Sequence, residues 1–154
     1  MKRAGFTMIE LIFVIVILGI LSAVALPKFL GVADQAKAGK LTAYVGTLNT
    51  TTLPSIWSKA IMDGNGSIVD YGTDITKNIA APDGITATFN SITIEPSAYD
   101  FNDSVAPSAD KQIAAKTYGT TKYTIVCKDG NSTAQPQCDI YNSKQSKWVL
   151  KNKY

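Results

Sequence analysis

A long uncharged apolar run near the N terminus limits most strongly what this chain can fold into. Residues 11–27 carry no charged side chain, and apolar residues between positions 6 and 9 lead into them. Together they approach the roughly 20 residues with which an α-helix crosses a bilayer. We therefore expect a membrane-inserted helix. Lys2 and Arg3 precede the run, so the positive-inside rule places this end in the cytoplasm and the rest of the chain outside.

An ordinary secretory signal peptide also has a cationic start and an apolar core. Two features of this chain argue against that alternative. The core continues through Pro27, Lys28 and Phe29 into an amphipathic pattern, where a signal peptide would have a cleavage site of small residues. In addition, Glu10 places a carboxylate at the edge of the apolar run, and a charge at membrane depth costs about 2.5–3.5 kcal/mol on insertion scales. Glu10 therefore needs a partner.

The residues around Glu10 resemble a known family signature. Gly5-Phe6-Thr7-Met8-Ile9-Glu10-Leu11 is similar to the N-terminal motif of type IV pilins and of the pseudopilins of type II secretion systems. In that family a prepilin peptidase cuts after the glycine, and the new N-terminal residue is N-methylated. The resemblance implies cleavage between Gly5 and Phe6 and methylation of Phe6. It covers the chain to about residue 30 and fades beyond.

Cleavage at this position would create a second charge close to Glu10. The new ammonium on Phe6 would lie in an apolar environment, four residues from the carboxylate. An internal pair is possible, whereas the resemblance implies that Glu10 of one subunit pairs with the amine of a neighbour. Pairing between subunits would neutralise both charges and set the axial register of packed helices, and the Thr7 hydroxyl would add a hydrogen bond to the cluster. The alternative is a boundary carboxylate that reaches the membrane surface.

Two residues within or after the run are expected to weaken the helix. Pro27 lacks an amide hydrogen and clashes with the preceding turn, and Gly19 lowers the cost of local unwinding. The resemblance implies that the helix loosens between these positions on assembly. The alternative is a passive kink, which membrane helices often contain.

The remaining sequence predicts an α+β fold. Helical spacing of apolar residues continues after Pro27, so one helix is expected from Phe6 to about Thr50, its first half apolar and its second half amphipathic. A break is expected at 50–54, with Thr52 as a possible N-cap of a short second helix that ends at residues 63–66. Residues 64–84 and 96–111 have loop composition. Strand-like alternation or β-rich composition is found at 85–95, 118–127, 138–141 and 147–150.

We thus expect a type IV pilin-like fold, in which the long helix packs on a small antiparallel sheet. The expected organisation is a leader peptide at 1–5, a membrane and filament-core helix at 6–28, and an extracytoplasmic globular domain at 29–154.

Cys127 and Cys138 flank a turn-rich decapeptide between two strand candidates. Two cysteines cannot alone form a structural zinc site, so a disulfide is the leading interpretation, and it fits an oxidising compartment. Two free thiols are the alternative. Type IV pilins similarly carry a disulfide near the C terminus, whereas major pseudopilins mostly do not, and this favours a pilus.

An extended prokaryotic N-glycosylation pattern occurs three times, with an acid two residues before Asn and Ser or Thr two residues after it. The acceptors would be Asn65, Asn102 and Asn131, all in predicted loops. Clusters of Asp and Asn are common in turns, which is the competing explanation. A calcium loop is a further alternative, although no spacing matches a full ligand set.

The absence of histidine removes the commonest general base and metal ligand, and no nucleophile, base and orienting group stand out together. We expect no enzyme, no cofactor, no metal site and no dedicated nucleic-acid site. The expected function is a structural subunit of a type IV pilus serving adhesion, twitching motility or DNA uptake, with a major pseudopilin as the alternative. A membrane-anchored binding module that never polymerises is a third class.

The expected partners are membrane lipid before assembly, other copies of the chain, a prepilin peptidase, an inner-membrane assembly platform and minor pilins. The expected location is the bacterial inner membrane, with a single pass and a cytoplasmic N terminus, followed by a surface pilus or a periplasmic pseudopilus.

Overall fold

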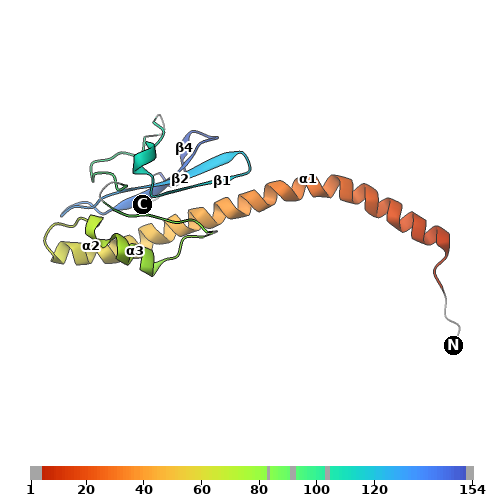
Figure 1. Cartoon of the computed structure of the whole chain (residues 1–154), viewed down its shortest axis with the longest axis horizontal. Coiled ribbons are helices and arrows are strands. Elements are labelled where there is room, and N and C mark those ends of the chain that lie inside the picture. The colour runs from red at the N-terminus through yellow and green to blue at the C-terminus, as the bar shows by residue number, and fades with distance from the viewer. Residues whose placement is uncertain (1–4, 83, 91–92, 103–104, 152–154) are drawn as a thin grey trace. The chain divides into compact units, whose positions relative to one another are not determined.

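The computed structural model describes residues 5–82, 84–90, 93–102 and 105–151. Helix α1 (Met8–Thr47) leads through a π-helical turn (Leu48–Thr52) into α2 (Leu53–Met62), as Figure 1 shows. A 3-10 turn (Val69–Tyr71) and α3 (Gly72–Asn78) follow, and a second 3-10 turn (Ala109–Lys111) precedes the sheet. The strands are β1 (Ala114–Tyr118), β2 (Thr121–Lys128), β3 (Gln137–Asn142) and β4 (Lys147–Trp148).

The chain divides into two compact units, one up to Gln35 and one from Ala36 onward. The first unit contains the apolar part of α1. The second contains the last three turns of α1, the shorter helices and the whole sheet.

The sheet is a four-stranded antiparallel meander in the order β1-β2-β3-β4. In Figure 1 its strands lie along the C-terminal part of α1, near α2 and α3. Gly119, with a φ of 57°, lies in the tight turn between β1 and β2. The predicted α+β fold, with a long N-terminal helix, a small antiparallel sheet and a C-terminal disulfide, is confirmed.

Side chains alternate between the two faces of the sheet, and both faces are covered. Ile125 and Cys127 of β2, with Cys138 and Ile140 of β3, belong to the main core, which includes Leu41, Val45 and Leu48 of the helical segment. The intervening positions Val126 and Tyr141 join a second cluster with Phe101, Trp148 and Tyr99. Because β2 is buried on both faces, it lies at the centre of the globular unit.

The expected break at 50–54 is a π-helical turn instead. Thr52 has helical backbone angles, and its side chain makes no capping hydrogen bond, so its prediction as an N-cap was wrong. The Leu53 amide donates to the Leu48 carbonyl, one residue beyond the α-helical partner. Pro54 supplies no amide hydrogen, and the wider turn lets the chain pass it without ending the helix.

The predicted strand at 85–95 is not formed in its described part. Ile85, Ala87 and Phe89 do turn toward the core while Thr86 and Thr88 are exposed, so the alternation was right. The segment has only scattered backbone bonds, such as Thr88 N–H to the Ile113 carbonyl at 3.0 Å, and a one-residue bridge from Glu95 to Lys128. Residues 91–92 lie outside the described part.

Other boundaries also differ from the expectation. The strand predicted at 118–127 is interrupted by a turn at 119–120: β2 begins at Thr121, and Tyr118 is the last residue of β1, which was otherwise missed. The segment 64–84, expected to be a loop, contains α3, which buries Ile75 completely. The predicted end of the second helix at 63–66 is confirmed, since α2 ends at Met62.

Candidate functional site

Thr7 and Glu10 form a reciprocal cap at the start of α1. The Thr7 amide and hydroxyl donate to Glu10 Oε2 at 2.8 and 2.7 Å, and the Glu10 amide donates to Thr7 Oγ1 at 3.4 Å. This is a capping box, in which a threonine and a glutamate three residues later satisfy each other's amides. The pattern Thr-x-x-Glu was visible in the sequence, but its capping role was not predicted. The helix consequently begins at Met8 rather than at Phe6.

The residues of the predicted cleavage site precede this cap. Gly5, Phe6 and Thr7 are outside regular secondary structure, and the Phe6 side chain is exposed. Residues 1–4, which include Lys2, Arg3 and most of the predicted leader, lie outside the described part. The structure therefore brings Thr7 and Glu10 together, while a pair between Glu10 and an amine on Phe6 stays a prediction.

Most side chains in the apolar part of α1 are exposed. No side chain in its apolar window is buried, and by length and composition the segment is able to cross a membrane. Gly19 and Pro27 both lie inside α1, and a Cβ added at Gly19 would meet nothing within 4 Å. The large exposed apolar side chains include Phe13, Leu18, Leu21, Leu26 and Phe29.

The disulfide lies in the globular unit, which begins at Ala36. Cys127 and Cys138 are bonded, directly opposite each other in the register of β2 and β3, and completely buried. The predicted cross-linked hairpin is confirmed. Closing a loop of this size contributes about 3 kcal/mol by constraining the unfolded chain.

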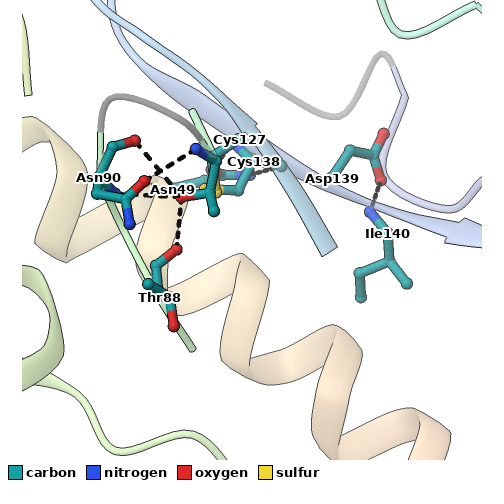
Figure 2. Close-up of a disulfide and its surroundings, with 8 residues drawn as sticks. Asn49, Thr88, Asn90, Cys127, Cys138, Asp139 and Ile140 are labelled. Atoms are coloured by element: carbon teal, nitrogen blue, oxygen red, sulfur yellow. Dashed lines mark hydrogen bonds between the residues drawn. A yellow bond between two sulfur atoms is a disulfide. The ribbon is translucent and has the colours of Figure 1, made fainter. Parts of the chain in front are cut away.

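Asn49 of the π-helical turn binds the peptide groups of Cys138. Its Nδ2 donates to the Cys138 carbonyl at 2.7 Å, and its Oδ1 accepts the Cys138 amide at 2.8 Å, so both ends of this buried amide are used. Figure 2 shows Asn49 beside the disulfide, with Thr88 and Asn90 close by. The buried Asp139 next in the chain accepts the Ile140 and Leu150 amides at 2.6 and 2.8 Å.

The loop that the disulfide closes also anchors two distant segments. Asp129 accepts the Ser67 hydroxyl at 2.6 Å and the Ile68 amide at 2.7 Å. The Trp57 indole donates to the Asn131 carbonyl at 2.9 Å. The disulfide loop is thus the point where residues 64–68 and helix α2 meet the sheet.

A polar cluster joins α2 to α3 on the surface. Lys59 forms an ion pair with Asp74 at 3.3 Å and lies over the Tyr71 ring, while the Tyr71 hydroxyl donates to Asp63. This bond raises the pKa of Tyr71 to about 12, with smaller contributions from burial and from the charges of Asp63, Asp70 and Asp74. Among the described residues, no three Cys, Asp or Glu side chains are grouped closely enough to hold a metal ion.

Comparison with known proteins identifies the N-terminal segment. Residues 1–26 match the family model described as the prokaryotic N-terminal methylation motif. The N-terminal segment therefore carries a prokaryotic N-terminal methylation motif. The match includes the Gly5–Phe6 junction and Glu10, the residues on which the resemblance to the pilin signature depends.

A type IV pilin is similar to the chain over a longer stretch. The chain is 39% identical over 62 residues to the type IV narrow pilus major component PilA5 of Thermus thermophilus. The alignment covers 40% of this chain and 53% of that pilin, so it spans about half the length of the relative. No solved structure matches the chain.

Proposed function

We propose that this chain is a type IV pilin, anchored in the inner membrane by residues 6–28 and assembled through them into a surface filament after cleavage of residues 1–5. The observation that carries the proposal is the methylation motif at the start of a helix whose apolar N-terminal window contains no buried side chain. Such a surface requires lipid before assembly and other apolar helices afterwards.

The disulfide and the relative favour a pilus over a pseudopilus. Type IV pilins resemble this chain in carrying a C-terminal disulfide, and the relative is a pilus major component. Adhesion, twitching motility or DNA uptake would then be the role of the fibre, with the globular unit from about residue 29 on its surface. A prepilin peptidase, an assembly platform and minor pilins would be the partners.

Glu10 is proposed to pair with the amine on Phe6 of a neighbouring subunit. In the uncut chain its carboxylate is occupied by Thr7, at 2.7 and 2.8 Å. A carboxylate oxygen accepts more than one hydrogen bond, so the cap need not open for an ammonium group to bind. The pair would neutralise two charges that are costly in an apolar core.

Mass spectrometry on sheared surface material and on membranes tests the proposal directly. A pilin predicts a chain that begins at methylated Phe6 and is abundant in the sheared fraction. The same processed chain confined to membranes would indicate a pseudopilin. A chain that still begins at Met1 in both fractions would refute the filament proposal.

Glu10→Ala tests the charge pair separately. It is expected to leave membrane insertion intact and to abolish filaments, while Asp34→Ala, which removes an acid from the same helix beyond the apolar run, assembles normally. Methylation of Phe6 in both variants would show that processing is unaffected. Normal filaments from Glu10→Ala would eliminate the proposed pair.

A further inference from the structure

We propose that Asn65 carries an N-linked glycan in the folded, exported protein, and that Asn131, in the same sequence pattern, does not. The occupant would be an oligosaccharide transferred from a polyprenyl diphosphate by a prokaryotic oligosaccharyltransferase. This proposal is independent of whether the chain forms a pilus or a pseudopilus, because both place the globular unit outside the cytoplasm.

Asn65 presents its amide nitrogen to solvent. The residue is exposed, directly after α2, and its Oδ1 accepts the Ser67 amide at 2.9 Å. Within the described part of the chain, its Nδ2 makes no hydrogen bond. The preceding Gly64 has open space around it, with nothing within 4 Å of an added Cβ. A glycan on Nδ2 would therefore preserve the existing bond through Oδ1 and displace no neighbour.

Asn131 uses both ends of its amide inside the fold. Its Oδ1 accepts the Thr133 amide, the Thr133 hydroxyl and the Ala134 amide at 2.8, 3.0 and 2.7 Å. Its Nδ2 donates to Ser97 Oγ at 3.2 Å, and the side chain is partly buried. A glycan on this nitrogen would compete with the Ser97 contact in a crowded loop. Turn chemistry therefore explains the pattern at Asn131.

The acid two residues before the asparagine is more accessible at Asn65 than at Asn131. Asp63 is exposed at the end of α2, where it accepts only the Tyr71 hydroxyl among described side chains. Asp129 is committed to the Ser67 hydroxyl and to the Ile68 and Gly130 amides. The acid at Asp63 therefore remains available to a transferase. At Asn102 the pattern includes residues 103–104, which lie outside the described part.

The Ser67 hydroxyl donates to Asp129 in the folded protein, so a transferase would have to break this one hydrogen bond to use the pattern at Asn65. Use of the pattern at Asn131 would break more bonds, because Asp129, the Asn131 amide and the Thr133 hydroxyl are all hydrogen-bonded there. In the transfer, Asn65 Nδ2 forms a bond to the anomeric carbon of the sugar while the bond from that carbon to the diphosphate oxygen breaks. One Nδ2 proton passes to the enzyme, and polyprenyl diphosphate leaves. No oxidation or reduction is involved.

Peptide mass spectrometry of the protein isolated from its native cells tests this proposal. Cleavage after lysine separates the three patterns, because Asn65 falls in residues 60–77, Asn102 in 78–111 and Asn131 in 129–144. A constant saccharide increment on 60–77 with an unmodified 129–144 is expected. An unmodified 60–77 peptide, or equal occupancy of 129–144, would overturn the proposal.

Matched substitutions assign the modification to the pattern. Asn65→Gln and Asp63→Asn are both expected to lose the increment. Asp70→Asn removes a nearby exposed acid outside the pattern and should keep full occupancy. Tyr71→Phe removes the hydrogen bond to Asp63 but not the acid, so it should also be glycosylated. Loss of the glycan in Asp70→Asn, or its retention in Asp63→Asn, would show that the pattern is not what the transferase reads.

Discussion

Asn49→Ala is expected to destabilise the globular unit by about 2 kcal/mol. The substitution deletes two buried hydrogen bonds, at 2.7 and 2.8 Å, between Asn49 and the peptide groups of Cys138. Each such bond has a net value of about 1 kcal/mol, and each orphaned group costs about 1–3 kcal/mol if nothing replaces its partner. Alanine recovers roughly 0.5 kcal/mol of helix propensity.

The size of the loss in unfolding free energy depends on whether water enters the site. A cavity of about 130 Å³, lined by Asn49, Gln135, Pro136 and Gln137, adjoins the site. It has room for a water molecule that binds the freed Cys138 groups, which lowers the loss toward the value of the two bonds alone. A fully dry site would instead cost about 4 kcal/mol or more.

Urea unfolding of the detergent-solubilised chain, followed by the fluorescence of Trp57 and Trp148, measures this loss. For a globular unit of this size it corresponds to a fall in Tm of roughly 8 °C. Thr51→Ala, an exposed change in the same π-helical turn, is the control and should stay within about 0.5 kcal/mol of the parent. If Asn49→Ala is no less stable than Thr51→Ala, the Asn49 bonds do not stabilise the fold.

Two further predictions concern Tyr71 and Gly130. Absorbance at 295 nm is titrated for the parent and for Tyr71→Phe, and the difference between the two curves should show a tyrosine with a pKa of about 12. The hydrogen bond from Tyr71 to Asp63 stabilises the fold below pH 10, and this stabilisation is lost as the pH rises toward 12. A difference curve centred near pH 10 would contradict the raised pKa. Gly130→Ala should lower the Tm of the globular unit, because its Cβ would lie 2.7 Å from the Gly66 carbonyl oxygen and 2.8 Å from Trp57 Cδ1. Gly39→Ala, in open space on α1, should instead raise the free energy of unfolding by roughly 0.5–1 kcal/mol, the amount that alanine gains over glycine in a helix, and so raise Tm. Equal Tm values for the two variants would refute the crowding argument.

Local signals predicted the parts of the fold that local chemistry determines. The apolar run, the end of α2 at Asp63 and Gly64, and the strands on either side of the disulfide loop each depend on residues close in sequence. The capping box of Thr7 and Glu10 is equally local but was not predicted, although the Thr-x-x-Glu spacing alone was sufficient to indicate it.

The features that were not predicted depend on contacts between residues far apart in the sequence. The π-helical turn places Asn49 on Cys138, 89 residues away, and no local pattern indicates that contact. Phe89 and its neighbours alternate like a strand, but a strand also needs a continuous backbone partner, which the described part of this segment lacks. Strand β1 was missed because Ala114, Ala115 and Lys116 have weak strand preference and gain order by pairing with β2.

The predicted glycosylation sites differ for the same reason. Sequence treats Asn65 and Asn131 as equivalent, because both have an acid before and a hydroxyl after them. Only the fold shows that Asn131 is bound to Ser97 and Ala134 while Asn65 faces solvent.

The capping box at Met8 also determines the backbone shape ahead of the helix. Proteases bind their substrates in extended form, and a scissile bond inside a helix would first have to unwind. Because Thr7 and Glu10 start the helix two residues after Phe6, the Gly5–Phe6 peptide bond is left outside it. If the bond is cut as proposed, the Glu10 carboxylate, for which we propose a role in assembly, also keeps this peptide bond outside the helix, where a peptidase is able to bind it in extended form.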